Sequence, residues 1–347
     1  MVGSLGLSIP EVASRKTISN SLLAPVNLTP PTFSGTLEPG QTLTVTSFGT
    51  WANLDPGFSD PEDYQWAIDG VTVPAAKNTT FVVPDNGENA DVTLVTDAFN
   101  FNFPTGPNDP TSSAVSKIVD PHWASVDLHL SFDGTNGSTT HEDASTNSAV
   151  PTTFNGNAAL SNLQTKFAVD TTSLLLDGTG DFCEIPDYAT LDWGGAGRSW
   201  TFEAWVRPTA IGVVSCIWGH RNAVGTAGGG LLNFHTTNTL RARTTNGGSS
   251  PMLLNAGTPT VSSGTWYHVA IVRNGTSWSL YQNGLRTDTD TQTGEPATEN
   301  ATHKIGRDEI DTSSDFTGNI AHVRYTGLAR YSGATLPVPV RPFYIAP

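Results

Sequence analysis

Apolar and polar residues alternate along much of this chain with a period of two. From Trp200 to Val206 the even-numbered residues are apolar and share one face, whereas Glu203, Trp205 and Arg207 share the other. This pattern is typical of a β-strand with one buried face, and it differs from the three-to-four-residue spacing of an amphipathic helix. Three dipeptides also supply the positive-φ positions of type I′ hairpin turns: Asp69-Gly70, Asn274-Gly275 and Asn283-Gly284. The sequence therefore predicts an all-β fold of antiparallel strands.

Composition excludes two classes of partner. Only 14% of the 347 residues are charged, and the 17 basic and 32 acidic residues give a net charge of −15. A nucleic-acid-binding protein needs basic residues to replace the counterions on phosphates, so we expect no nucleic-acid partner. No apolar run approaches the roughly 18 residues that cross a bilayer, so we expect no membrane insertion. The N-terminus also lacks the basic and apolar regions of a signal peptide.

The sequence divides into an N-terminal arm at 1–24, a first β domain at 25–103, a linker at 104–118 and a second β domain at 119–347. The arm has no sustained period. It is either disordered or a docking segment that adds to a neighbour's sheet. The docking candidates are three alternating apolar residues and a fourth that would fill a separate pocket: Leu5, Leu7, Ile9 and Val12.

Residues 25–103 carry the motifs PTFSGTLEPGQTLTV, GTW and YQWAIDGV. These motifs resemble the bacterial and phage immunoglobulin-like domains that decorate cell-surface and virion proteins. The resemblance implies a small β-sandwich with Trp66 in its core and without inter-sheet cysteines. Residues 104–118 then carry three prolines among polar residues. That composition indicates a linker, or a last strand followed by a linker.

The second domain carries a longer series of motifs, in order, from Leu130 to Tyr331: LSFDGTNGSTT, SLLLDGTGDFCEIP, WTFEAWVRP, GTWYHVAIVR and GLARY. They resemble the laminin-G-like, concanavalin A-like jelly-roll domain, which implies a large antiparallel sandwich. The opening FDGTNGSTT and the ending LPVPVRPF are similar to the version found in tailed-phage virion proteins. In that lineage such domains occur on tail fibres, head fibres and capsid decoration proteins.

Related jelly rolls include glycosidases, which need two carboxyl groups about 5 to 9.5 Å apart. Their usual Glu-x-Asp-x-x-Glu run is missing, and Asp177, Asp181 and Glu184 have a different spacing. Glu203 remains as a candidate, with a polar group on the outer or concave face of a sheet as the alternative. The eight histidines are scattered singly, without the spacing of a zinc site, and no Gly-x-Ser-x-Gly elbow occurs. We therefore expect no enzymatic activity.

Two further ligand classes follow from the resemblance. Laminin-G-like jelly rolls often bind calcium near the first Asp-Gly turn, and Asp133, Asp143 and Asn147 match that pattern. In a late motif of the same pattern, Ala321 stands where the family often has an aspartate. The alternative role of these Asp and Asn side chains is to cap turns. We expect no cofactor to be required, and calcium is the one ion that this resemblance suggests as a ligand. Sugar binding would use aromatic rings, with core packing as the alternative: the candidates are Tyr188, Trp193, Trp205 and Trp218.

The two cysteines, Cys183 and Cys216, are too few for a disulfide scaffold or a structural zinc cluster. We expect buried free thiols, with a disulfide as the alternative.

These observations predict a non-enzymatic structural protein on the surface of a tailed-phage virion. The expected role is capsid decoration or head fibre, with capsid or tail proteins as partners and attachment through the N-terminal arm. Many copies of a modest module attached to one particle gain avidity. A homo-oligomer, such as a trimer, is also expected, although no sequence motif indicates it. The alternatives are a tail-fibre or receptor-binding lectin that recognises host-surface glycans, and a polysaccharide hydrolase.

Overall fold

The computed structural model describes residues 23–54, 63–74, 76–98, 111–145, 150–221, 228–246, 249–292, 296 and 300–345. The chain divides into two compact units. The smaller unit is Met1–Leu37, Gln41–Val82 and Asp91–Lys117, and the larger unit is Glu38–Gly40, Val83–Ala90 and Ile118–Pro347. Within the described ranges, the helical elements are three short 3-10 turns: η1 (Trp123–Ser125), η2 (Ala189–Leu191) and η3 (Thr312–Ser314). None of them is long enough to span a membrane.

The smaller unit consists of short antiparallel strands in three sheets. The sheets are β1-β4, β2-β3-β7 and β10-β8-β5-β6, and β9 also pairs with β8. The strands are β1 (Val26–Thr29), β2 (Thr32–Ser34), β3 (Thr42–Ser47), β4 (Thr50–Ala52), β5 (Asp63–Ile68), β6 (Val71–Thr72), β7 (Thr80–Val82), β8 (Asp91–Asp97), β9 (Thr111–Ser112) and β10 (Ser116–Lys117).

Trp66 is fully buried in the smaller unit, as the sequence predicted. Its ring stacks on Phe81 at 5.3 Å and meets the edge of Phe33 at 5.1 Å, and its indole N–H donates to the Asn78 carbonyl at 3.0 Å. The immunoglobulin-like assignment itself stays a prediction.

Part of the predicted linker at 104–118 is strand. β9 pairs with Val95 and Thr96 of β8, and β10 pairs with Asp91 and Val92 of the same strand. The polar residues of this stretch give no alternating pattern, because their contribution is backbone hydrogen bonding along β8 rather than apolar burial. The boundaries of the predicted linker stay a prediction.

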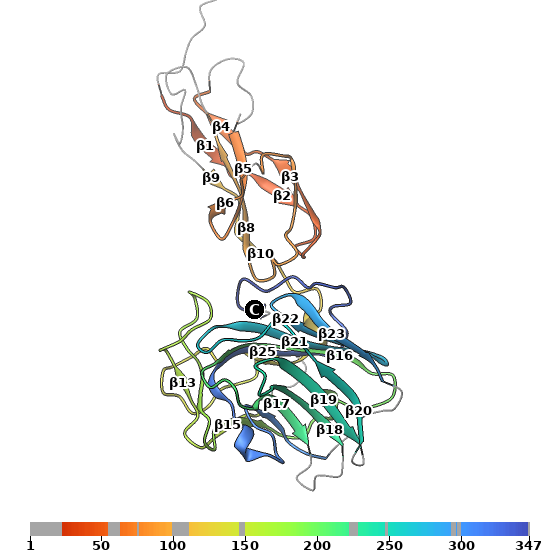
Figure 1. Cartoon of the computed structure of the whole chain (residues 1–347). Coiled ribbons are helices and arrows are strands. Elements are labelled where there is room, and N and C mark those ends of the chain that lie inside the picture. The colour runs from red at the N-terminus through yellow and green to blue at the C-terminus, as the bar shows by residue number, and fades with distance from the viewer. Residues whose placement is uncertain are drawn as a thin grey trace, which may run out of the picture. The chain divides into compact units, whose positions relative to one another are not determined.

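The larger unit is a sandwich of two antiparallel sheets that pack face to face (Figure 1). The eight-stranded sheet runs β13-β14-β25-β16-β21-β22-β23, with β11 also paired to β25. Its strands are β11 (Val126–Leu130), β13 (Ala159–Ser161), β14 (Ser173–Asp177), β16 (Ser199–Pro208), β21 (Tyr267–Asn274), β22 (Ser277–Gln282), β23 (Leu285–Thr291) and β25 (Thr317–Thr326).

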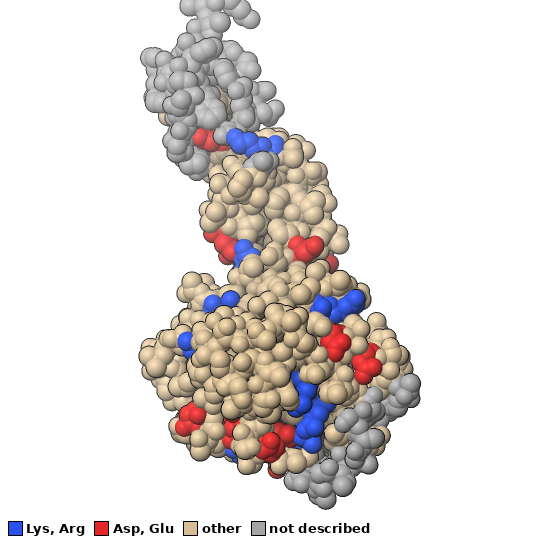
Figure 2. Space-filling model, viewed as in Figure 1, with Lys and Arg blue, Asp and Glu red and all other residues tan. Residues whose placement is uncertain are grey.

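The seven-stranded sheet of the larger unit runs β12-β15-β24-β17-β18-β19-β20. Its strands are β12 (Thr153–Asn155), β15 (Phe182–Ile185), β17 (Ser215–Arg221), β18 (Gly229–Phe234), β19 (Leu240–Asn246), β20 (Ser249–Asn255) and β24 (His303–Ile305). On the face drawn in Figure 2, charged side chains of the larger unit form small groups within a mostly uncharged surface. No continuous basic stripe is visible there, in keeping with the low charge content.

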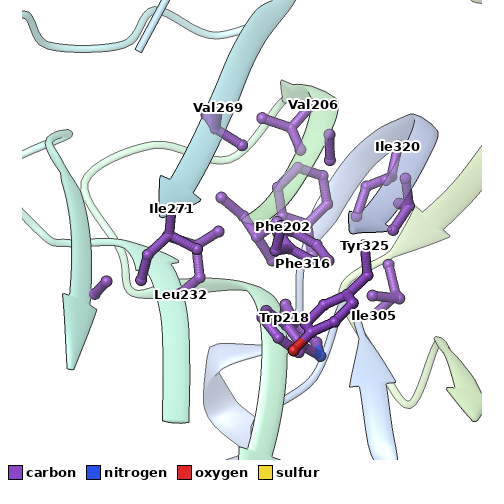
Figure 3. Close-up of a cluster of buried hydrophobic side chains, with 14 of the residues drawn as sticks. Phe202, Val206, Trp218, Leu232, Val269, Ile271, Ile305, Phe316, Ile320 and Tyr325 are labelled. Carbon is purple, nitrogen blue, oxygen red and sulfur yellow. The ribbon is translucent and has the colours of Figure 1, made fainter. Parts of the chain in front are cut away.

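The core of the larger unit lies between its two sheets. Phe202 and Val206 of β16 point toward Trp218 and Ile305 of the opposite sheet (Figure 3). The even-numbered residues of β16 from Trp200 to Val206 all belong to this core, as predicted. The expectation that only one face is buried is wrong, because Thr201, Glu203 and Trp205 on the opposite face are also buried.

Two of the three predicted hairpin turns are confirmed. Asp69 and Gly70, and likewise Asn283 and Gly284, have positive φ at both central positions, as a type I′ turn requires. The third prediction is wrong by one residue. Asn274 pairs with Ser277, so the central residues are Gly275 and Thr276, and only Gly275 has a positive φ. A glycine at the first central position is typical of a type II′ turn instead.

The last part of the chain covers the outer face of the eight-stranded sheet. We call residues 328–345 the C-terminal strap. Leu336 of the strap packs with Val272 and Tyr281, and Tyr344 packs with Trp123. The Leu336 N–H also donates to the Gly284 carbonyl at 2.8 Å. Both faces of this sheet are therefore buried over the strands that the strap crosses.

Two edge strands, one from each sheet, are joined by side chains. β20 ends the seven-stranded sheet and β23 ends the eight-stranded sheet. Asp288 and Asp290 of β23 accept hydrogen bonds from the backbone N–H groups of Asn255 and Leu253 at 2.7 and 3.2 Å. The outward N–H groups at these two positions of β20 are thus already paired.

Candidate functional site

The former catalytic candidate, Glu203, is fully buried beneath the strap. Its Oε1 accepts a hydrogen bond from Arg324 Nε at 3.0 Å, and its Oε2 accepts one from the Tyr331 hydroxyl at 3.0 Å. His268 Nε2 lies 3.1 Å from the same Oε2. Every nearby partner holds the carboxylate in place.

The network continues through a second carboxylate. Asp120 accepts hydrogen bonds from Arg324 at 3.1 Å and from two nitrogens of Arg330 at 2.9 Å. Glu88, which belongs to the larger unit, also pairs with both arginines. Three carboxylates thus surround two guanidinium groups; the side chains of Asp120 and Glu203 are fully buried, whereas that of Glu88 is 17% exposed.

The electrostatics of this network argue against acid catalysis by Glu203. Burial alone raises the pKa of Glu203, but the charge of Arg324 and the hydrogen bond from His268 outweigh it, so the pKa lies well below its ordinary value. A general acid must hold a proton near neutral pH, and it must reach its substrate. Glu203 meets neither condition, and the arrangement acts as a structural ion network.

The aromatic residues that were candidates for sugar stacking are used for packing. Trp193, Trp205 and Trp218 are between 0% and 5% exposed, and Tyr188 packs against the core. Gly230 shows how closely Trp193 fits, because a Cβ at Gly230 would lie 1.8 Å from the indole ring. The core-packing alternative therefore applies to these four residues.

The two described residues of the predicted calcium site accept hydrogen bonds from other parts of the domain. Asp133 Oδ1 accepts hydrogen bonds from Thr171 N and Thr171 Oγ1, both at 2.6 Å. Asp143 accepts from His129 N at 2.7 Å with Oδ1, and from Ser145 Oγ at 2.7 Å with Oδ2. Asn147 lies outside the described residues. Because donors already occupy both oxygens of Asp143, its carboxylate does not suit a cation as it stands, and the calcium site stays a prediction.

The docking candidates Leu5, Leu7, Ile9 and Val12 also lie outside the described residues, and their role stays a prediction. Cys183 and Cys216 are buried and not joined in a disulfide. Burial raises the pKa of both thiols, so neither is a reactive nucleophile.

A polar groove lies on the outer face of the seven-stranded sheet. It encloses about 370 Å³ and is lined by Glu184, Arg221, Asn300, Ala301, Thr302, Lys304 and Glu309. Glu184 accepts a hydrogen bond from Thr302 Oγ1 at 3.3 Å, and Lys304 Nζ lies 3.6 Å from the same carboxylate. Lys304 also pairs with Glu309. The groove offers charged groups, a hydroxyl and an amide together, as recognition of sugar hydroxyls requires.

On the inner side of the same strands, two histidines meet. Trp218 pairs with Ile305 and Gly219 with Lys304, which puts His220 of β17 opposite His303 of β24. Their rings stack at 3.9 Å. Local spacing could not reveal this pair, because β17 and β24 become neighbours only through sheet topology.

Two aspartates complete a group around these histidines. Asp187 and Asp192 flank η2, and one ligand atom from each of the four side chains lies within 4.8 Å of the others. This group of His and Asp residues was missed by the sequence analysis, which looked for short repeats of metal ligands.

Comparison with known proteins supports the fold of the larger unit. Residues 177–330 match the family model of the concanavalin A-like lectin/glucanase superfamily. Together with the two antiparallel sheets, this match identifies a concanavalin A-like jelly-roll domain. No curated protein sequence matches the chain.

Several solved structures are similar to the chain at low sequence identity. The binding domain of Paraclostridial Mosquitocidal Protein 1 has 14% identity and a TM-score of 0.49, over 60% of this chain and 50% of that chain. Domain 4 of AbnA, an extracellular GH43 arabinanase from Geobacillus stearothermophilus in complex with arabinotriose, has 20% identity and a TM-score of 0.44, over 59% and 93%. The binding domain of botulinum neurotoxin serotype D has 15% identity and a TM-score of 0.43, over 60% and 49%. The match thus spans about half the length of the two toxin chains.

Proposed function

We propose that this chain is a non-enzymatic structural protein on the surface of a tailed-phage virion, as capsid decoration or head fibre. The observation that carries the proposal is the fate of Glu203, the one carboxylate singled out as a catalytic candidate, which is sealed in an ion network. A jelly roll whose candidate carboxylate is buried in this way suits display or adhesion rather than catalysis on a glycan. The phage-type wording of its first and last motifs supports the virion location.

Attachment is assigned to residues 1–24, through Leu5, Leu7, Ile9 and Val12. The test is particle assembly with a protein that lacks these residues. We expect a folded, soluble protein that no longer joins particles. Replacing Leu5, Leu7 and Ile9 by serine should have the same effect, while replacing the intervening Ser4 and Ser8 by alanine should not. Normal incorporation of the shortened protein would remove the arm from the proposal.

Homo-oligomerisation belongs to the same proposal. Many weak attachments on one particle act together when copies are linked, so a multimeric form raises avidity without a new contact. A monomer in solution at all concentrations would contradict this part while leaving attachment through the arm open.

A second candidate function is recognition of host-surface glycans, favoured by the polar groove. No stacking ring from the predicted set lines the groove, so recognition would rest on hydrogen bonds that Lys304 and Thr302 donate and that Glu184 accepts. In a glycan array, Glu184→Gln and Thr302→Val should lose the signal of the unmodified protein. Thr209→Val, an exposed change elsewhere on the same unit, is the matched control. An array without any signal for the unmodified protein would reject this candidate.

A further inference from the structure

The strongest unassigned feature is the group Asp187, Asp192, His220 and His303. Three of its four members are buried, and Asp187 is exposed. Two neighbouring strands and the segment around η2 supply the four side chains. Three separate parts of the chain thus bring their side chains to one point. A chance cluster of acidic residues on the surface would not combine buried histidines in this way.

We propose that these four side chains bind one first-row transition-metal dication of the zinc type. One ligand atom from each residue lies within 4.8 Å of the others. Tetrahedral zinc, with bonds of about 2.0 to 2.2 Å, needs ligand atoms about 3.3 to 3.5 Å apart. The largest of these separations has to shrink by up to about 1.5 Å, and the exposed side chain of Asp187 has the most room to move.

The donor set selects the metal. Two imidazole nitrogens and two carboxylate oxygens suit zinc and its neighbours, whereas calcium takes six to eight oxygens. This group of donors is therefore poorly suited to calcium. It differs in this from the site that the family resemblance implies around Asp133.

His303 supplies an independent observation. Its side chain is fully buried, and at least one of its ring nitrogens has no hydrogen-bond partner among the described residues. A buried polar atom is normally paired, so an unpaired nitrogen directed into a cluster of donors points to a missing ligand.

The surroundings of His220 agree with this role. Its Nε2 lies 3.1 Å from the Ala301 carbonyl, so Nδ1 is the nitrogen that would bind the metal. A hydrogen bond from a ring nitrogen to a backbone carbonyl fixes the tautomer, as it does for most histidines that bind metals. A metal at this point would tie β17 and β24 to the η2 segment beside Trp193 and Trp218. Its role would be structural, and it does not depend on the virion assignment.

The test uses the full chain without a histidine tag, stripped with a chelator and dialysed. We expect one equivalent of Zn²⁺ per chain after gel filtration, measured by elemental mass spectrometry. Co²⁺ should give the visible absorption bands of tetrahedral coordination. Zn²⁺ at 100 times its Kd should raise Tm by about 5 to 10 °C, and Ca²⁺ at the same concentration should not.

Asp187→Asn is the decisive variant, because an exposed side chain can change without unfolding the protein. It should weaken Zn²⁺ binding at least tenfold while Tm in chelator stays that of the unmodified protein. Asp85→Asn, the same change at another exposed site, should bind normally. His220→Gln should abolish the cobalt bands. The proposal fails if neither Zn²⁺ nor Co²⁺ binds, if Ca²⁺ stabilises equally, or if Asp187→Asn binds Zn²⁺ as tightly as the unmodified protein.

Discussion

At the scale of single residues, the buried ion network makes Glu203 a stability residue. Glu203→Gln removes one carboxylate and leaves Arg324 buried with less compensating charge. Breaking a buried ion pair in this way costs about 3 to 5 kcal/mol. We expect a loss of that size in the free energy of unfolding, measured with urea, whereas the exposed change Glu142→Gln should stay within about 0.5 kcal/mol. A fully stable Glu203→Gln protein would show that the network is not as closed as described.

His129 gives the protein an acid-sensitive core. It is fully buried against Trp123 and Phe343, and burial, reinforced by the charge of His322, holds its pKa well below the ordinary 6.5. The unfolded chain therefore binds a proton at this residue below pH 6.5 while the folded chain does not. Stability due to the neutral ring is present above pH 6.5 and is lost as the pH falls below it.

The variant His129→Leu removes this proton uptake. Between pH 6.5 and 5 its stability should fall less steeply than that of the unmodified protein, by about 1.4 kcal/mol per pH unit. Urea unfolding at several pH values measures the slope, and the difference in slope should vanish above pH 7.5. Parallel pH profiles throughout would show that His129 does not titrate on unfolding.

Residue roles were only partly open to prediction from the sequence. Alternation placed Glu203 on the outer face of its strand, but nothing local to Glu203 signalled that Arg324 and the strap would bury it. His220 and His303 are likewise adjacent only because β17 pairs with β24. Roles that depend on long-range pairing cannot be obtained from spacing along one strand.

At the scale of elements, the two hairpin turns of the eight-stranded sheet differ in their surroundings. Gly275 and Gly284 both have positive φ, which costs an alanine about 1 to 2 kcal/mol. A Cβ at Gly275 would meet nothing within 4 Å, whereas one at Gly284 would lie 2.6 Å from Val338 of the strap. Gly284→Ala should therefore destabilise by about 1 to 3 kcal/mol more than Gly275→Ala in urea unfolding. Equal effects would mean that the strap yields freely at this turn.

The strap should behave as part of the jelly roll, although the family match ends at residue 330. Leu336 is 5% exposed, and Leu336→Ala should cost about 2 to 5 kcal/mol in the free energy of unfolding. Val340 lies in the same strap but is 52% exposed, so Val340→Ala should change stability by less than about 0.5 kcal/mol. If the two variants were equally stable, the strap would be loosely held.

The elements themselves were largely predictable, because period-two alternation and Asn-Gly or Asp-Gly turns act locally. The turn at Gly275 was predicted one residue too early, and its type was therefore wrong. Its position depends on which residues of β21 and β22 pair, and the dipeptide alone does not determine that pairing. β9 and β10 were obscured by their polar composition. The strap was noticed only as the motif LPVPVRPF, and its packing on the sheet was not predicted because its apolar residues follow no fixed period.

At the scale of the whole molecule, the net charge of −15 sets how copies of the chain approach one another. Like charges repel, and salt screens that repulsion, with a Debye length near 10 Å at 0.1 M. Association between copies should therefore strengthen with salt. Light scattering should give a larger average mass at 300 mM NaCl than at 20 mM, whereas a falling mass would indicate contacts between opposite charges.

The carboxylates of Asp288 and Asp290 on the margin of β20 have a consequence for crowded display. An unpaired strand margin is a template on which a second molecule can extend the sheet, and repetition of that event yields fibrils. On a particle covered with copies of this chain, the local concentration would be high enough to make such zippering a hazard. Two acidic side chains that already occupy the exposed donors let the molecules stand close together and remain separate.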